Sequence, residues 1–176
     1  MVPILSVIGF SKTGKTTFIG NLVRALYERG HRVAVIKHDP HDHGEVDREG
    51  SDTSVFWKAG SPAVVLSSPQ RMTLFRRTGE DTPPESIVPL LGDVDCVLLE
   101  GYKGKSYPKV VIWSSKMKEF SLKQEELLAV IYNRGEEEGL QEWFYHEVPL
   151  FNRDEIMNFV TFLEKNYLAV NQQSKE

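Results

Sequence analysis

The sequence has very little cysteine, no long hydrophobic run and no excess of positive charge, and each absence excludes a class of protein. Cys96 is the only cysteine among 176 residues, so an intramolecular disulfide is impossible and a cytoplasmic location is expected. No apolar run approaches the roughly 20 residues of a membrane span, and no charged leader precedes an apolar core near the N-terminus. The formal net charge of −4 argues against a nonspecific nucleic-acid binder. We therefore expect a chain that binds neither membrane nor nucleic acid.

The composition that remains is that of an ordinary globular protein. Hydrophobic residues make up 40% of the chain and charged residues 26%, close to the usual values, and a length of 176 residues is enough for a sizeable core. Cys96 lies inside the apolar run 94–99, where a buried and inert thiol is expected. Because no internal repeat or domain boundary is evident, we expect one domain over residues 1–170 and a polar tail over residues 171–176.

Short apolar runs alternate with segments of helical period along the chain. Strands are expected at 4–8, 32–37, 63–66, 72–75, 96–99, 109–113 and 127–131, and helices at 17–26, 51–59, 83–91 and 153–167. The runs 63–66 and 72–75 are close enough to form a hairpin. This order predicts an α/β fold with three layers, in which helices flank a mostly parallel sheet. A ligand is then expected at the carboxyl ends of the strands.

The most informative segment is Gly9–Thr16, which reads GFSKTGKT and matches the phosphate-binding pattern G-x-x-x-x-G-K-[ST]. It stands between an expected strand and an expected helix, which is the context that this motif needs. Backbone N–H groups and the positive end of the helix dipole then point at phosphate oxygens. Lys15 is expected on the β- and γ-phosphates and Thr16 on Mg²⁺. We predict a nucleoside triphosphate site with Mg²⁺, its phosphates held by the loop residues Gly9, Ser11, Lys12, Thr13, Gly14, Lys15 and Thr16.

A carboxylate follows the buried strand 96–99, in the segment Glu100-Gly101-Tyr102-Lys103. An acid at the end of a strand beside a phosphate loop is the expected position for a residue that holds Mg²⁺ through a water or polarises the attacking water. The alternative is a loop acid without a ligand. We predict that Glu100 is a catalytic residue on the metal side.

The segment Lys37-His38-Asp39-Pro40-His41-Asp42-His43 follows the second strand. Asp39 stands where a carboxylate can coordinate Mg²⁺ or orient water, and we predict both a metal and a catalytic role for it. The three histidines of the segment suggest a transition-metal site, but they have no cysteine partners. A loop that closes over phosphates or over a second ligand is the other interpretation.

After the strand 127–131, the segment Asn133-Arg134-Gly135-Glu136 is a loose version of the N-K-x-D element that reads guanine in many GTPases. A carboxylate can accept hydrogen bonds from N1–H and N2–H₂ of guanine, which adenine does not supply. Glu136 is the candidate acceptor, and Asn133 is expected to hold the loop or N7. An ordinary turn with solvated charges is equally consistent with the acidic run 136–138.

Taken together, these motifs resemble the molybdopterin-guanine dinucleotide biosynthesis protein B family, MobB, over roughly residues 1 to 165. The resemblance rests on GFSKTGKTT, KHDPHDH, the pair 50–53 and 59–61, and LLEGYK followed by Pro108-Lys109. It implies a small P-loop NTPase that binds GTP, hydrolyses it weakly, forms homodimers and assists the enzyme that attaches GMP to molybdopterin. It also implies that Thr17 joins Gly14, Lys15 and Thr16 on phosphate and Mg²⁺.

The sequence therefore predicts a cytoplasmic GTP-binding accessory protein of molybdenum cofactor guanylylation. The expected partners are a molybdopterin guanylyltransferase and a second copy of the chain, with molybdopterin itself as a further candidate ligand. Two other functions stay open at this point. A GTPase for metal insertion would use His38, His41 and His43, and a small-molecule kinase would need a lid with arginines, for which Arg71, Arg76 and Arg77 form the available cluster.

Overall fold

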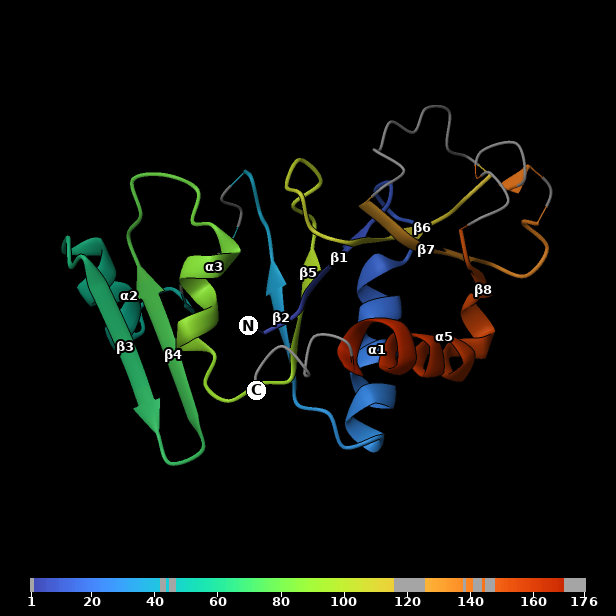
Figure 1. The fold of residues 1–176 in the computed structure, drawn as a ribbon. Helices are drawn as coiled ribbons and strands as arrows, with labels where there is room; N and C mark the ends of the chain where they lie inside the picture. Colours follow the sequence, from blue (N-terminus) through green and yellow to red (C-terminus); the bar gives the residue numbers. More distant parts are fainter. Residues whose placement is uncertain are drawn as a thin grey trace. The chain divides into compact units, whose positions relative to one another are not determined.

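The computed structural model of the chain describes residues 2–41, 44, 47–115, 126–137, 139–140, 144 and 148–169 (Figure 1). Its contacts divide the chain into two compact units, of which the larger comprises Met1–His38 with Val88–Glu176 and the smaller comprises Asp39–Ile87. This division does not test whether residues 1–170 fold as one domain, which stays a prediction. The expected tail, 171–176, lies outside the described residues.

Six parallel strands form the sheet of the larger unit (Figure 1). They are β1 (Ile4–Ile8), β2 (Val33–Lys37), β5 (Cys96–Glu100), β6 (Lys109–Ile112), β7 (Leu127–Tyr132) and β8 (Leu150–Asn152). Their order across the sheet is β2-β5-β1-β6-β7-β8, and every neighbouring pair is parallel. Val7 of β1 lies opposite Glu100 of β5 and Val110 of β6, so the carboxyl ends of these three strands meet at one edge.

Two helices, α1 (Lys15–Glu28) and α5 (Ile156–Leu163), cover one face of this sheet (Figure 1). The apolar residues of α1 recur at helical spacing, which places them on one stripe toward the strands. The rings of Phe18 and Phe159 lie 5.9 Å apart where the two helices meet. Alternate strand residues point to the opposite face, where Val111, Trp113 and Val130 pack with Leu140 and Phe144. The expected α/β fold, a mostly parallel sheet flanked by helices, is confirmed.

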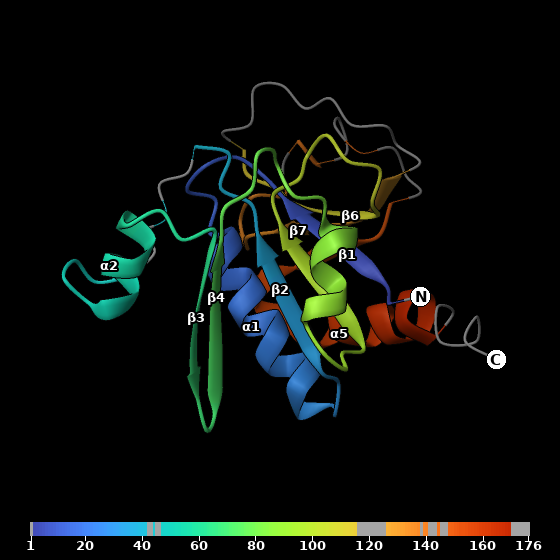
Figure 2. The same ribbon diagram turned by 90° about the vertical axis from the view of Figure 1, so that its left-hand side faces the viewer.

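The smaller unit has a sheet of its own, an antiparallel hairpin of β3 (Ala63–Ser68) and β4 (Arg71–Arg76) (Figure 2). It also contains α2 (Asp52–Lys58) and the short helix α3 (Pro84–Ile87). Ser51 caps α2, because its side chain accepts a hydrogen bond from the backbone N–H of Ser54. The expected hairpin is therefore confirmed, and its strands pair with each other in a separate sheet.

The largest difference from the expected elements lies near the C-terminal end. Strand β8 was not expected, because three residues are too few to show a period. The helix expected over 153–167 is divided into a 3₁₀ turn, Arg153–Glu155, then α5, then a π-helical turn, Glu164–Leu168.

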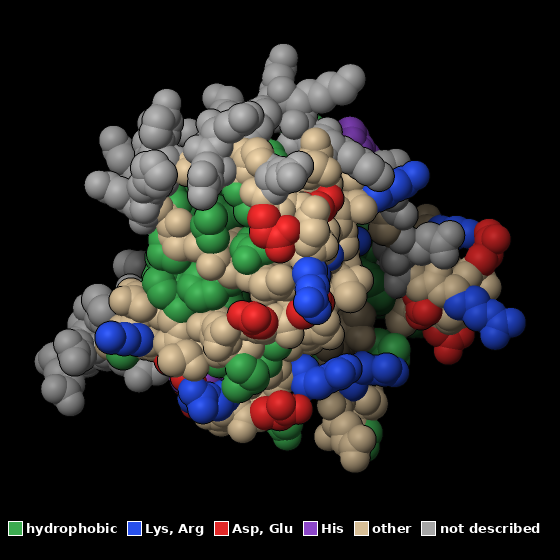
Figure 3. Space-filling model, turned by 90° about the vertical axis from the view of Figure 1, so that its right-hand side faces the viewer, with side chains coloured by type: hydrophobic (Ala, Val, Ile, Leu, Met, Phe, Trp, Pro, Cys, Tyr) green, Lys and Arg blue, Asp and Glu red, His purple; other side chains and the backbone are tan. Residues whose placement is uncertain are grey.

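Figure 3 shows the face on the β8 side, where acidic and basic side chains are interspersed and hydrophobic side chains gather in one patch. None of the described helices is long and apolar enough to cross a membrane.

Candidate functional site

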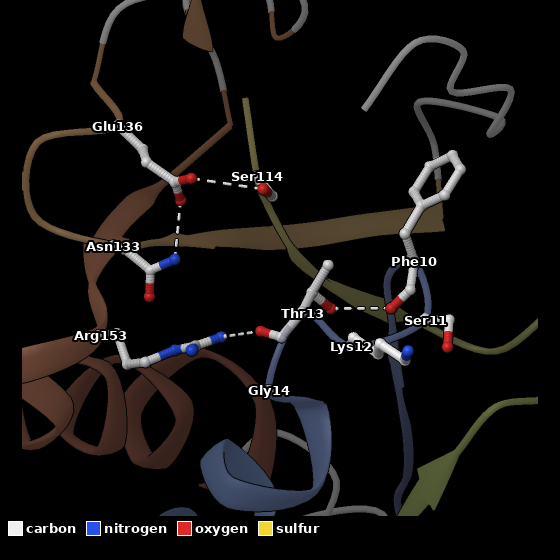
Figure 4. Close-up of a pocket in the computed structure, with 9 residues that line it drawn as sticks. All are labelled: Phe10, Ser11, Lys12, Thr13, Gly14, Ser114, Asn133, Glu136 and Arg153. Carbon is white, nitrogen blue, oxygen red and sulfur yellow. Dashed lines mark hydrogen bonds between the residues drawn. The ribbon is translucent and has the colours of Figure 1, made fainter. Parts of the chain in front are cut away.

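The phosphate loop Gly9–Thr16 leads from the end of β1 into the first turn of α1 (Figure 4). Gly14 precedes the helix with a φ of +77°, a left-handed conformation that favours glycine. Gly9 is needed for a different reason, since a Cβ there would lie 2.9 Å from the backbone carbonyl oxygen of Ile112. Gly14 therefore lets the chain turn into α1, and Gly9 lets the loop pass close to the end of β6.

The side chain of Lys15 lies across this loop. Its Nζ donates a hydrogen bond of 2.6 Å to the carbonyl oxygen of Phe10, and Thr13 Oγ1 donates one of 2.9 Å to the same oxygen. Burial lowers the pKa of Lys15, and the positive charge of Lys103 lowers it further, while Glu100 acts in the opposite direction. A phosphate group beside Lys15 would favour its charged form. The ammonium group is thus placed where an anion would stabilise it.

Glu100 ends β5 beside the first turn of α1. Thr16 Oγ1 donates a hydrogen bond of 2.9 Å to Glu100 Oε1, although 84 residues separate the two in sequence. A hydroxyl and a carboxylate side by side are hard oxygen donors that suit Mg²⁺, which usually takes one or two protein oxygens plus substrate phosphates and waters. Among the described residues there is no group of three or more His, Cys, Asp or Glu side chains that could hold a metal alone. A magnesium ion here would therefore need the phosphates of a nucleotide as further ligands.

The turn after Glu100 has an unusual backbone. Gly101 has a φ of +105° and Tyr102 a φ of +53°, which is uncommon for a residue with a side chain. Tyr102 is held there because its buried ring stacks on that of His38, with centroids 4.4 Å apart. The turn brings Lys103 toward the phosphate loop, where its Nζ lies 5.6 Å from the centre of the Phe10 ring. His38 therefore supports this turn within the larger unit.

The predicted base-reading segment lies on the same pocket as the phosphate loop (Figure 4). Glu136 Oε2 accepts a hydrogen bond of 2.7 Å from Asn133 Nδ2, and Oε1 accepts longer ones of 3.3 Å from the hydroxyls of Ser114 and Ser115. The carboxylate is held from three sides, whereas Glu137 is exposed. The pocket has a volume of about 640 Å³, and its lining residues are Phe10, Ser11, Lys12, Thr13, Gly14, Ser114, Asn133, Glu136 and Arg153.

Arg153 and Ser114 line the pocket but were not predicted from the sequence, and Arg153 is the more distant of the two from the phosphate loop in sequence. It follows β8, the strand that was not expected, and it lies 140 residues from its hydrogen-bond partner, the carbonyl oxygen of Thr13. A signal exists in the sequence, since Asn152 stands before the expected helix 153–167 as a residue type that caps helices, and residues after a strand of a parallel sheet lie at its carboxyl edge. Because β8 was not predicted, this rule could not place Arg153 at the carboxyl edge of the sheet.

Thr17 and Cys96 of the larger unit are not among the residues that line this pocket. Asp39 belongs to the smaller unit, where its carboxylate accepts a hydrogen bond of 3.3 Å from the backbone N–H of His41, so its catalytic and metal roles stay predictions. His43 lies outside the described residues. Thr17 is exposed in the first turn of α1. Cys96 is buried as expected, and burial raises the pKa of its thiol to about 12.

The arginine cluster considered for a kinase lid has other contacts. Arg77 lies over the ring of Trp57 at 4.0 Å and donates hydrogen bonds to the carbonyl oxygens of Trp57 and Ser61. These contacts join the residue after β4 to α2 and to the segment between α2 and β3 within the smaller unit. Arg77 thus has a structural role, which weighs against a kinase lid built on this cluster.

Comparison with known proteins gives one consistent result. Residues 4–133 match the family model described as molybdopterin guanine dinucleotide synthesis protein B. A probable molybdopterin-guanine dinucleotide biosynthesis adapter protein of Bacillus subtilis is 32% identical over 156 residues, which cover 87% of each chain. The corresponding adapter protein of Escherichia coli K12 is 35% identical over 121 residues, 64% of this chain and 66% of the relative. A crystal structure of Bacillus subtilis MobB superposes with a TM-score of 0.68 at 26% identity and covers 93% of this chain and 99% of that one.

Proposed function

The chain belongs to the molybdopterin guanine dinucleotide synthesis protein B family, MobB, and from this premise we propose that it is a GTP-binding adapter protein of molybdenum cofactor biosynthesis. In this role it assists a molybdopterin guanylyltransferase, forms homodimers and hydrolyses GTP slowly with Mg²⁺. The assignment to this pathway is supported by the names of its relatives, which are molybdopterin-guanine dinucleotide biosynthesis adapter proteins.

The observation that carries the proposal of nucleotide binding is that the phosphate loop, Asn133 and Glu136 line the same pocket. Its volume of about 640 Å³ lies in the range of small-molecule sites. At one end of the pocket lie the backbone of the phosphate loop and the start of α1. Phosphates are favoured there, because the helix dipole and the N–H groups of the first helical turn attract anions. The other end offers a carboxylate. A nucleotide is a ligand that carries phosphates at one end and hydrogen-bond donors at the other.

The carboxylate of Glu136, at the other end of the pocket, supports the proposal that the chain binds guanine in preference to adenine. Glu136 is oriented by the 2.7 Å bond from Asn133, while its two serine bonds of 3.3 Å are longer than most O–H···O hydrogen bonds and are readily replaced. Guanine N1–H and N2–H₂ are neighbouring donors that a carboxylate accepts together. Adenine presents no such pair, so the same carboxylate would discriminate against it.

The residues expected to hold Mg²⁺ support the proposal of slow GTP hydrolysis. Thr16 and Glu100 supply oxygens for Mg²⁺, which would neutralise charge on the phosphates. Residues 9–22, which form the phosphate loop and the start of α1, contain no arginine and no glutamine, and an arginine finger raises the rate of hydrolysis by about 10³–10⁵. An adapter protein needs binding of the nucleotide more than its rapid turnover.

Two measurements test the proposal. Titration with GTP and ATP in the presence of Mg²⁺ should show tighter binding of GTP, and a guanylyltransferase partner should be captured by the GTP-loaded chain. Lys15→Ala should weaken both, whereas Lys165→Ala, an exposed lysine beyond α5, serves as the matched control and should weaken neither. Absence of nucleotide binding, or equal affinity for ATP, would contradict the proposed function.

A further inference from the structure

Arg153 connects the C-terminal part of the chain to the phosphate loop (Figure 4). Its Nη2 donates a hydrogen bond of 2.8 Å to the carbonyl oxygen of Thr13. Its Nη1 lies so near the backbone that a Cβ on Gly14 would be 2.8 Å away. Figure 4 shows the guanidinium group reaching from the start of the last helical segment across the pocket to this loop. The guanidinium group is therefore in contact with Gly14, the residue immediately before α1.

Most of the hydrogen-bonding capacity of this guanidinium is unused within the described part of the chain. An arginine side chain carries five N–H donors, and the Thr13 carbonyl occupies one of them. Nε is buried and has no hydrogen-bond partner among the described residues. A buried donor without a partner destabilises the protein, so a ligand group that accepts a hydrogen bond from it is favoured.

The charge of Arg153 is also incompletely balanced. Burial lowers its pKa, while the negative charges of Glu136 and Asp154 act in the opposite direction. Within residues 2–41, 47–115, 126–137 and 148–169, no carboxylate forms an ion pair with it, so the two acids act only at longer range. A half-buried cation of this kind on the wall of a pocket favours an anionic ligand.

We propose that Arg153 binds the α-phosphate of the guanine nucleotide, an inference that rests on the proposed function. The assignment follows from its place between the two ends of the pocket. Lys15 and the loop are expected on the β- and γ-phosphates, and Glu136 on the base, so the ribose and α-phosphate lie between them. Of these two groups the α-phosphate carries the charge, and its oxygens can accept from more than one N–H of a guanidinium.

An alternative role is indirect. By holding the Thr13 carbonyl, Arg153 would shape the phosphate loop and would influence every ligand of that loop without contacting the nucleotide. The two roles differ in their effect on a ligand that occupies the loop but lacks a nucleoside and its α-phosphate. Inorganic pyrophosphate with Mg²⁺ is such a ligand.

The experiment compares the wild type with Arg153→Met and Arg153→Lys, and uses Arg29→Met as the matched control. Arg29 is an exposed arginine just beyond α1 that pairs with Glu164, away from the pocket lining. Affinities for GTP, GDP and pyrophosphate are measured by competition, and thermal unfolding without ligand verifies that each variant is folded. We expect Arg153→Met to weaken GTP and GDP by about tenfold or more, with pyrophosphate unchanged and with Arg153→Lys in between.

The possible outcomes are separable. An equal loss for pyrophosphate and GTP would overturn the contact with the α-phosphate and leave only the indirect role. Unchanged GTP affinity in a folded Arg153→Met variant would overturn the inference while the proposed function stands. If the wild type itself does not bind GTP, the proposed function fails first.

Discussion

Replacement of Glu136 is the sharpest test of base recognition, because the structure holds this carboxylate in a defined orientation. A carboxylate has about four acceptor sites. One is used by Asn133 at 2.7 Å, and two are used weakly by Ser114 and Ser115 at 3.3 Å. Guanine can therefore bind by taking one free site and replacing one serine hydroxyl, while the Asn133 bond keeps the side chain in place.

The expected magnitude follows from this arrangement. Glu136→Gln keeps the shape but presents an amide in place of a charged acceptor, so at least one charged hydrogen bond to guanine is lost. A charged hydrogen bond contributes about 1.5–3 kcal/mol, which corresponds to about ten- to a hundredfold in GTP affinity. ATP should lose little, because adenine has no paired donors to lose. XTP should gain, because the amide N–H₂ of glutamine can donate to the oxygen at position 2 of xanthine.

Comparative titration of GTP, ATP and XTP against the wild type, Glu136→Gln and Glu136→Ala measures these changes. Glu137→Ala is the matched control, because this neighbouring acid is exposed and does not line the pocket. Glu138, the third acid of the run, lies outside the described residues. Unfolding of the apo proteins separates a loss of stability from a loss of binding, since Glu136→Ala also leaves Asn133 without its partner. A GTP-to-ATP ratio that is the same in all variants would refute base reading by Glu136.

Three further outcomes are expected. Lys15→Ala should lower triphosphate affinity about ten- to a hundredfold in a folded protein, as measured by calorimetry, and unchanged affinity would disprove the site. Glu100→Gln should leave GTP binding nearly intact but slow single-turnover hydrolysis or weaken its Mg²⁺ dependence, since it removes the charge beside Thr16; wild-type kinetics would refute the role. Hydrogen bonding, chiefly from Arg29, holds the pKa of Glu164 below its usual value of 4.5, so the pair stabilises the fold above pH 4.5 and loses this effect as the pH falls through the lowered pKa. Glu164→Gln should therefore lower stability by less than about 1 kcal/mol at pH 7 and flatten the acid side of the stability profile, and melting curves with identical pH slopes would contradict this.

Local sequence patterns were sufficient to predict the strands and the helix that surround the phosphate loop. The strand, glycine loop and helix over residues 4–26 could be predicted because each follows from near neighbours in sequence: an apolar run, two glycines and a helical period. The buried strand β5 was also predictable, since its continuous apolar run is typical of the centre of a parallel sheet. From strand order alone, Glu100 was expected near the metal side of the loop, and the structure places it on Thr16.

The proposed base-reading site could be predicted only in part from the sequence. Asn133 and Glu136 are three residues apart, so a motif could suggest them, but the acidic run gave no reason to prefer Glu136 over its neighbours. The preference comes from Ser114, which reaches Glu136 from the end of another strand. No local rule states which strand ends are adjacent, because that depends on the order of the whole sheet.

The class of fold and the phosphate loop follow from the amino-acid sequence alone, because they depend on residues within a few positions of one another. The contact of Arg153 with Thr13 and Gly14 is visible only in the folded protein. The tertiary structure also decided that the hairpin of the smaller unit forms its own sheet and that a three-residue strand completes the larger one. Contacts between residues 140 positions apart arise from the packing of strands and helices, and a short strand is stabilised by its neighbour more than by its own composition.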